Sequence, residues 1–352
     1  MRWSIFIILS LSLACTKKEA AAPVEPEQAA ETETAPPSEA PEPMVGIPED
    51  PTAEVPRPKG APELPEALQT PAPPLDAAPV LEVLERGKEP RQALRWTLKP
   101  GAEQKVKLDV GFALDALVVV MRVGEGTYVV SYDLTLRAGK PERDGSMPVS
   151  FTVDAASIEE MFIGEKRADR MQAALTAARK ITGSYTLGPR GRMSNLEVKL
   201  PPDATRTSHD IADNLRWALI QMTPEFPEEP LGQGAKWTVQ KGITQRGVHV
   251  NQLSTMELVK VDGKRVKLAM KQQQSAAKQS FQEPGLPLTQ ELTLLSGKAD
   301  GPLDWNLTEL APRAADLSAN VLKAVEQGSN KPDAKSVEVI VQASRALKID
   351  EK

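Results

Sequence analysis

The sequence predicts a fold of the α+β class that is mainly antiparallel β: a curved sheet, more than one such sheet, or a half-barrel, packed with two to three helices. Three observations lead to this prediction. Apolar and polar residues alternate in many short stretches, turn residues separate several of these stretches, and a few segments show apolar residues at helical spacing instead. Alternation of this kind marks strands with one buried and one solvated face, which is typical of antiparallel sheets.

Several stretches alternate strongly enough to predict strands. In residues 106–110, Val, Leu and Val alternate with Lys and Asp, and similar alternation runs through 128–136, 149–153 and 266–270. Residues 337–341 read V-E-V-I-V and predict a final strand that returns to the sheet. Each stretch is as long as an ordinary strand.

Two hairpin turns are predicted between such strands. Asp262-Gly263 is a strong signal for a two-residue turn, because glycine adopts the positive φ that these turns require. Gly124-Glu125-Gly126 predicts a similar turn, between strands expected at 118–123 and 127–136.

The clearest helical pattern covers residues 211–222, where the apolar residues lie on one face. Thr207 or Ser208 is a suitable N-cap, and Pro224 ends the helix. We therefore expect an amphipathic helix whose apolar face packs on the sheet.

Two further helices are predicted from weaker patterns. One lies within residues 156–180 and is broken at Gly164, and its apolar residues include Ile158. The other covers residues 317–325 and is closed by Gly328, since glycine commonly ends helices.

The folded part also repeats itself weakly. Residues 95–101 (R-W-T-L-K-P-G) match residues 236–242 (K-W-T-V-Q-K-G), and a strand and a hairpin follow each segment. We interpret this as an internal duplication of a unit with strand, hairpin, further strands and helix. The first β-rich half would be residues 92–222, and the second half of the same domain residues 235–349. Chance similarity among amphipathic strands is the alternative.

The N-terminus has the parts of an export signal. Arg2 supplies the positive charge, residues 5–13 form the apolar core, and Ala14 is the small residue that a signal peptidase needs before Cys15. An apolar run this short is not a stable membrane span. The sequence therefore predicts a signal peptide at residues 1–14.

The segment Leu11-Ser12-Leu13-Ala14-Cys15 resembles the lipobox of bacterial lipoproteins, although Ser12 stands where that family most often has Leu. The resemblance implies that Cys15 carries acyl chains such as palmitate and becomes the first residue of the mature chain. Thr16 stands in place of Asp, which by the sorting rule of enteric bacteria implies the outer membrane as destination. An ordinary secretory signal, with Cys15 incidental, is the alternative.

Residues 15–80 are acidic and rich in proline. Between residues 19 and 80 lie 16 of the 31 prolines, and 13 acidic residues against only Arg57 and Lys59. This composition cannot offset the entropy of ordering, so we expect the lipidated cysteine to be followed by a disordered, extended tether. The rest of the chain is close to neutral, which argues against nucleic acid as a partner.

The loop at residues 224–237 reads P-E-F-P-E-E-P-L-G-Q-G-A-K-W. It resembles a proline- and glycine-rich loop that precedes a Trp-bearing strand in an uncharacterised domain of bacterial lipoproteins. The resemblance covers roughly residues 92–349, and its specificity rests on this loop and the overall layout. It implies an envelope location and a mainly β domain, and it carries no catalytic residues.

The side chains that metal or nucleophile chemistry needs are sparse. Cys15 is the only cysteine, so no intramolecular disulfide and no site built from several cysteines exist. His209 and His249 are the only histidines, and they are not at metal-ligand spacing. We expect no metal site and no cofactor.

Three short patterns are weak matches to catalytic motifs. Gly232-x-Gly234 lacks the third glycine of a dinucleotide loop. Ser275-x-x-Lys278 lacks the companion elements of penicillin-interacting enzymes. Glu159 and Glu160 would point apart on a helix and so form solvated surface. The sequence therefore predicts no catalytic residue and a protein that is not an enzyme.

Trp96, Trp237 and Trp305 are the remaining candidate site residues. Trp96 and Trp237 occupy the same place in the two similar segments, which favours core anchors of equivalent strands. A platform on which a ligand stacks is the alternative, since Trp faces bind flat apolar groups.

These observations predict a membrane-anchored lipoprotein of the cell envelope that binds or scaffolds an unknown envelope component and faces either the periplasm or the cell surface. The alternative is a periplasmic carrier of a hydrophobic ligand. The layout loosely resembles lipoprotein carrier folds, in which a curved sheet covered by helices holds an apolar cavity. Such a carrier should have a connected apolar pocket of roughly 300–1,000 Å³ between sheet and helices.

Overall fold

The computed structural model describes residues 66–69, 71–75, 77–118, 121–162, 165–286, 288–327 and 337–350. The predicted signal peptide, Cys15 and most of the predicted tether lie outside these ranges. Pro62–Lys352 form one compact unit, so the two β-rich halves of the chain share a single folded body.

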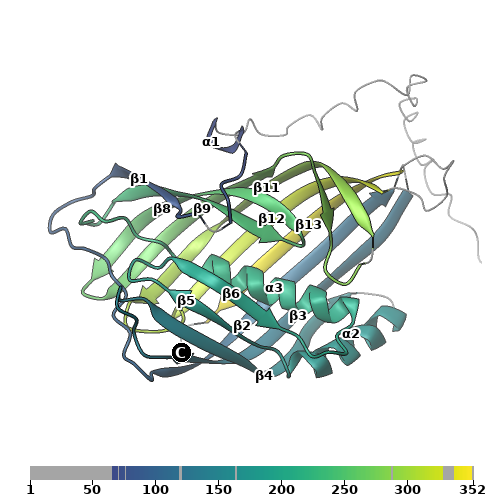
Figure 1. Cartoon of the computed structure of the whole chain (residues 1–352), viewed down its shortest axis with the longest axis horizontal. Coiled ribbons are helices and arrows are strands. Elements are labelled where there is room, and N and C mark those ends of the chain that lie inside the picture. The colour runs from purple at the N-terminus through teal and green to yellow at the C-terminus, as the bar shows by residue number, and fades with distance from the viewer. Residues whose placement is uncertain are drawn as a thin grey trace, which may run out of the picture. The chain divides into compact units, whose positions relative to one another are not determined.

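Within these ranges, 13 strands form one antiparallel sheet, which confirms the prediction of a mainly antiparallel β protein. Their order across the sheet is β1-β7-β8-β9-β11-β12-β13-β2-β3-β4-β5-β6, and β10 pairs with β11. Figure 1 shows that the sheet is strongly curved. The strands are β1 Val80–Glu85, β2 Glu103–Val118, β3 Met121–Ala138, β4 Met147–Phe162, β5 Thr182–Leu187, β6 Met193–Lys199, β7 Lys236–Gln245, β8 Val248–Asp262, β9 Arg265–Ala276, β10 Gln279–Gln282, β11 Thr289–Asn306, β12 Ala314–Gln327 and β13 Val337–Ile349.

Strand β13 joins the two parts of the sheet. It pairs with β12 on one side and with β2 on the other, although β2 lies more than 200 residues earlier in the chain. The strand predicted at 337–341 is therefore confirmed, and it extends to Ile349. Because β13 has a neighbour on each side, its backbone hydrogen bonds are satisfied across both ladders.

Helix α3, Arg206–Met222, lies on the concave side of the sheet (Figure 1). Thr205 is its N-cap and forms a capping box with Ser208, so the cap lies two or three residues earlier than expected. Tyr132 on β3 donates a hydrogen bond to the Ile211 carbonyl, and Trp305 on β11 donates to the Met222 carbonyl. The helix predicted at 211–222 is thus confirmed, and the sheet holds it at both ends.

Two other helices complete the described fold. Helix α2, Glu165–Ala178, packs against α3 and β4. Helix α1, Glu66–Gln69, is a single turn near the described start of the chain. Prediction from the sequence placed α1 inside the tether, whereas the structure places it on the sheet.

The segment that contains α1 is fixed to β7, β8 and β9. The Ala67 carbonyl accepts hydrogen bonds from the side-chain amides of Gln240 and Asn251, and the Leu68 carbonyl accepts one from Ser275 Oγ at 2.7 Å. The Leu68 side chain is buried. The folded part therefore begins before residue 80, because polar side chains on the sheet bind the backbone of a proline-rich segment.

The helix predicted at 317–325 is wrong. Residues Ala314–Gln327 form β12, which pairs with β11 and β13 over most of its length. Ala315, Leu317 and Ala319 are buried while the residues between them are exposed. Two of these three buried residues are alanines, so the alternation of buried and exposed residues could not be recognised from large apolar residues alone.

The helix predicted within 156–180 is wrong in its first part. Strand β4 continues to Phe162, so Glu159 and Glu160 lie on a strand, and α2 starts only at Glu165. The pairing of β4 with β3 shifts between Val129 and Val130, where β4 has one extra residue. This bulge gives Ile158 and Met161 a spacing of three within a strand, which resembles helical spacing.

The turn predicted at Gly124-Glu125-Gly126 is also wrong. These residues belong to β3 and pair with residues 114–116 of β2, and the connection lies between Val118 and Met121. The longer pairing satisfies more backbone groups, and β13 supports β2 up to Val118 from the other side. Gly124 and Gly126 therefore lie within strand β3 and not in a turn.

The second hairpin is confirmed. Strands β8 and β9 pair down to Asp262 and Arg265, which leaves Gly263 and Lys264 as the two-residue turn. Gly263 has a φ of 58°, a value that glycine adopts without steric cost. The turn lies one residue later than the dipeptide that predicted it.

The duplication stays an interpretation. Hairpins β2–β3 and β8–β9 follow the two similar segments, but Trp96 lies outside any strand whereas Trp237 lies in β7. The helix expected at the end of the second copy is strand β12. The two halves therefore differ, because helices α2 and α3 both lie in the first half.

The capping box of α3 gives a stability prediction. Replacing Thr205 by Ala removes the side-chain acceptor of the Ser208 amide, and we expect the free energy of unfolding to fall by about 1 kcal/mol. Thr207→Ala is the matched control, because Thr207 lies inside the first turn and makes no capping contact; it should change stability little. Urea denaturation of both variants measures the difference, and equal losses would contradict the assigned cap.

Candidate functional site

A pocket of about 410 Å³, the rim pocket, opens beside the C-terminal end of β13. The pairing of β13 with β2 stops at Lys348 and Asp109, whereas β2 continues back to Glu103. On this side, the segment 103–107 of β2 faces the loop between β11 and β12 instead of a strand. The pocket is lined by Ala102, Glu103, Gln104, Lys105, Val106, Lys107, Thr308, Glu309, Leu310, Pro312, Arg313, Ile349 and Asp350.

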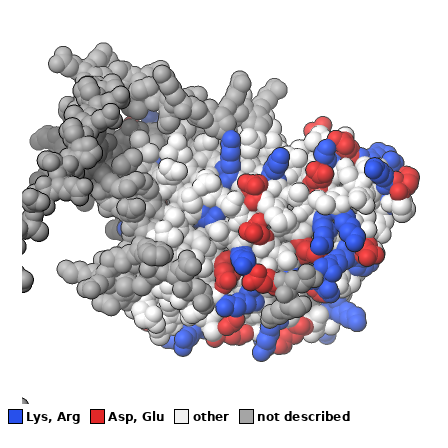
Figure 2. Space-filling model, turned by 180° about the vertical axis from the view of Figure 1, so that it is seen from behind, with Lys and Arg blue, Asp and Glu red and all other residues white. Residues whose placement is uncertain are grey.

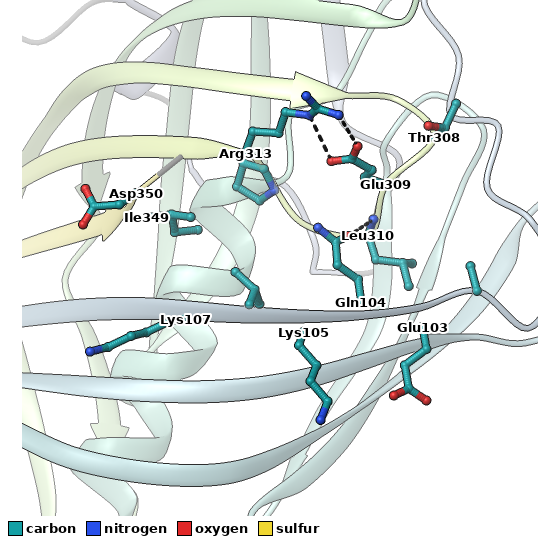
Figure 3. A pocket seen from close by; sticks show the side chains of 13 residues that line it. Glu103, Gln104, Lys105, Lys107, Thr308, Glu309, Leu310, Arg313, Ile349 and Asp350 are labelled. Carbon is teal, nitrogen blue, oxygen red and sulfur yellow. Dashed lines mark hydrogen bonds and ion pairs between the residues drawn. The ribbon is translucent and has the colours of Figure 1, made fainter. Parts of the chain in front are cut away.

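Gln104 crosses part of this opening (Figure 3). Its Oε1 accepts hydrogen bonds from the backbone amides of Leu310 at 2.6 Å and Ala311 at 3.0 Å, and its Nε2 donates to the Ala311 carbonyl. The side-chain amide thus satisfies loop groups that a strand would otherwise satisfy. The pocket is a local interruption of the sheet, bridged by one side chain.

Several charged residues around the pocket form pairs of opposite sign. Arg313 and Glu309 face each other in Figure 3, with Nη2 and Oε1 2.7 Å apart, and this pairing raises the pKa of Arg313. Glu103 pairs with Arg137 at 2.8 Å. These pairs leave a mixed, nearly balanced lining, which suits hydrogen bonding to a polar backbone better than binding of a strongly charged ligand.

The three candidate tryptophans meet in the core. Trp96 and Trp305 are edge to face at 4.5 Å, and Phe226 lies 6.3 Å from Trp96 and 5.9 Å from Trp237. Trp237 Nε1 donates to the Glu225 carbonyl at 2.8 Å. All three indoles are buried, so they anchor the loop after α3 and are not accessible to a stacking ligand in this state.

The histidines lie in separate contacts. His249 Nε2 is 2.8 Å from the Pro73 carbonyl, next to the segment that holds α1. His209 lies in the first turn of α3 beside Gly285. Among the described side chains, no group of three or more His, Cys, Asp or Glu residues is placed to hold a metal ion.

The short motif matches have structural roles. Ser275 Oγ donates to the Leu68 carbonyl, while Lys278 is exposed in the connection between β9 and β10. A Cβ at Gly232 would lie 1.7 Å from the Lys88 carbonyl, so this glycine permits close contact between two loops.

A buried ionic network near α3 was not found from the sequence. Arg246 pairs with Asp210 at 2.6 Å and with Glu283 at 3.0 Å, and Glu283 also pairs with Lys323 at 2.7 Å. Burial alone would raise the pKa of Glu283, but the cations Arg246 and Lys323 lower it to about 2. The partners come from four separate elements, so local spacing gave no signal.

Arg345 makes a second ionic contact with α3. Its Nη2 lies 3.1 Å from Asp213, and its guanidinium lies 5.6 Å from the ring centre of Trp217 and 5.9 Å from that of Phe112. Burial lowers the pKa of Arg345 and Asp213 acts against this shift. The contact ties the middle of α3 to β13.

Polar side chains also fill the space between α3 and strands β8 and β9. Gln272 donates to Gln221 of α3 at 2.7 Å, and Gln274 donates to Gln252 at 3.0 Å. The two cavities found along this face of α3 measure about 20 and 10 Å³. Each is at most the size of one water molecule.

No protein-family model matches the chain, and a comparison with curated proteins finds no match. Of the helices in the described ranges, none has both the length and the hydropathy of a membrane span.

The ionic network gives a prediction with a pH dependence. Glu283→Gln leaves the buried cation Lys323 without its anion, so we expect a loss of about 3 kcal/mol in unfolding free energy at pH 7. The folded-state pKa of Glu283 is depressed from 4.5 to about 2. Its stabilisation is therefore present above pH 4.5 and is lost as the pH falls towards 2.

Denaturation of wild type and variant between pH 2 and 7 measures this. The difference between them should shrink below pH 4.5. Glu103→Gln is the control, because the pair Glu103–Arg137 is exposed and contributes little. A difference that is constant with pH would contradict the role given to Glu283.

Proposed function

We propose that the chain is a membrane-anchored lipoprotein of the bacterial cell envelope that binds or scaffolds another envelope component without catalysis. The observation that carries the proposal is the N-terminal pattern. The lone cysteine of the chain, Cys15, follows Ala14 and the apolar run 5–13, and it precedes an acidic, proline-rich stretch. An exported protein with one cysteine at this place is suited to lipidation.

The physics of anchoring agrees with this pattern. Each buried methylene contributes about 0.8 kcal/mol, so one acyl chain binds reversibly and several anchor a protein stably. By its resemblance to the lipobox family, Cys15 would carry palmitate or similar acyl chains. Thr16, in place of Asp, would direct the lipoprotein to the outer membrane. The proposal leaves open whether the domain faces the periplasm or the cell surface.

Two features of the folded part support a binding role without catalysis. The side chains that matched catalytic patterns make structural contacts, as Ser275 and His249 do. The rim pocket offers unpaired strand backbone of β2 and a balanced set of charges. Figure 2 shows that lysines and arginines alternate with acidic residues over the described face of the molecule, a pattern typical of a solvated protein surface.

The carrier alternative has the layout in its favour, because α3 covers the concave side of a curved sheet (Figure 1). A carrier also needs a connected apolar pocket of roughly 300–1,000 Å³. The cavities of about 20 and 10 Å³ beside α3, and the glutamines that surround them, weigh against it. We therefore favour binding at the surface over transport in the interior.

A cysteine variant tests the anchor. Cys15→Ser should abolish labelling with an acyl-chain probe and move the protein from the membrane fraction to the soluble fraction, because the thiol is the acyl acceptor. Ser12→Leu, which completes the family pattern, is the matched control and should keep both properties. Membrane association unchanged in Cys15→Ser would overturn the proposal.

Native mass spectrometry tests the carrier alternative. We expect the full-length Cys15→Ser chain to be purified without a bound lipid, because Gln221, Gln252 and Gln272 fill the space between α3 and strands β8 and β9. The measurement compares its mass before and after denaturation. A stoichiometric lipid released on denaturation would replace the scaffold proposal by the carrier one.

A further inference from the structure

The outer face of β7, β8 and β9 holds a segment of the chain that precedes the sheet. This segment, residues 66–69 and 71–75, is called the strap, and its helix α1 lies outside the curved sheet (Figure 1). Asn251 of β8 contacts the strap, whereas its neighbour Gln252 contacts Gln221 of α3. Successive side chains of a strand point to opposite faces of the sheet. The strap and α3 therefore lie on opposite faces.

The residues that hold the strap carry no acidic, lysine or arginine side chain. They are called the strap face, and Gly242, Asn251 and Ser275 are paired side by side across β7, β8 and β9. Gln240 and His249 complete the strap face, and both make hydrogen bonds to the strap. The strap face thus binds its segment through polar side chains without ion pairs.

Side chains of the strap face donate hydrogen bonds to backbone carbonyls of the strap. The Ala67 carbonyl accepts from the side-chain amides of Gln240 and Asn251, each at 2.9 Å. The Leu68 carbonyl accepts from Ser275 Oγ at 2.7 Å. Donors suit a proline-rich segment, because each proline has a backbone C=O but no N–H.

Gly242 allows the other end of the strap to approach the sheet closely. A Cβ at this position would lie 1.9 Å from the Pro73 carbonyl oxygen. His249 Nε2 lies 2.8 Å from the same oxygen and must be the donor, because a carbonyl oxygen only accepts. A larger residue at position 242 would therefore block this part of the strap face.

The composition of the strap matches this surface. Residues 67–75 (A-L-Q-T-P-A-P-P-L) form the longest run without a charged residue between residues 19 and 80, and three of the nine are prolines. A charged residue in their place would lose water without gaining an ion pair on the strap face. The sheet therefore holds the part of the acidic stretch that fits a surface of neutral donors.

The strap can leave the sheet without opening the core. Leu68 is 3% exposed, but it is not among the residues of the apolar core clusters, and Leu75 is 56% exposed. Ordering an extended segment costs conformational entropy that so few contacts offset only in part. The strap face recognises one leucine and nearby carbonyls, which a segment of another protein can equally supply.

We propose that the strap face is a docking site for a neutral, extended, proline-rich segment of another envelope protein, and that the strap is an intramolecular occupant that this segment replaces. The partner segment would place a leucine where Leu68 lies and a proline carbonyl where that of Pro73 lies. This site rests on the proposed scaffolding function and gives it a surface and a partner chemistry.

The strap sets how concentrated the partner must be. A segment of the same chain competes at a high effective concentration, and the apparent affinity for a partner falls by the fraction of chains whose site is free. A partner held at the same membrane is concentrated in the same way. The strap thus excludes dilute proline-rich segments and admits those of neighbouring envelope proteins.

A peptide with the strap sequence tests the site in the full-length Cys15→Ser chain. The labelled probe is P-E-A-L-Q-T-P-A-P-P-L, residues 65–75, and fluorescence anisotropy measures its binding. Adding Leu68→Asp should release the strap and tighten probe binding at least about tenfold, because the competing segment is gone. Leu75→Asp, the same change at an exposed strap position, is the matched control and should leave the affinity unchanged.

Two further changes show what the strap face recognises. Gly242→Leu combined with Leu68→Asp should abolish the tight binding, because the leucine side chain blocks the site. A probe with Ala in place of its prolines should bind the Leu68→Asp chain about threefold or more weakly, since it is less preorganised and adds N–H groups that need partners. Leu68→Ala is a milder release and should shift the affinity in the same direction if Leu68→Asp does not fold.

Several outcomes would overturn the proposal. They are equal probe affinity with and without release of the strap, tight binding that survives Gly242→Leu, and equal affinity for the alanine probe. A wild-type dimer in sedimentation that Leu68→Asp dissociates would assign the strap face to a second copy of the chain and would also overturn it. Acyl labelling at Cys15 in wild type reports the anchor independently, so failure of the docking site and failure of the envelope proposal are distinguishable.

Discussion

The fold depends on how α3 covers the concave face of the sheet. A sheet of this length buries one face, and in the described part of the chain α3 and α2 are the long helices available to cover it. The helix meets side chains from strands far apart in the sheet order, including Tyr132 on β3 and Trp305 on β11. Because α3 crosses the concave side of the sheet, specific contacts along its length fix its position.

These contacts are more polar than a hydrophobic core requires. Asp210 of α3 binds Arg246 in the turn between β7 and β8, and Asp213 binds Arg345 of β13. Gln221 hydrogen-bonds with the glutamines of β8 and β9. Buried ion pairs add little net stability over apolar packing, but removing one partner is costly. The network therefore fixes where α3 lies more than it strengthens the fold.

The sequence correctly predicted those elements that depend on local patterns. The hairpin after Asp262, the strand that starts at residue 337 and the helix over 211–222 follow from turn chemistry and periodicity alone. Strand β12 was missed because small alanines carry half of its alternation, and the bulge near Val130 made part of β4 resemble a helix. The rim pocket and the ionic network could not be predicted, since each depends on pairing between segments that are distant in the chain.

The same long-range pairing locates the surfaces that remain for a partner. Sheet backbone becomes available where pairing stops, which occurs beside β2 where β13 ends and along β1 at the edge. Gln104 satisfies backbone groups at the first opening from within the chain. The pairing of β1 with β7 shifts register between Val83 and Glu85, and exposed Glu82 and Glu85 add negative charge, so this edge is protected as well. Backbone that the pairing leaves open is therefore satisfied by a side chain beside β2, and at β1 it is protected by a bulge and by charge.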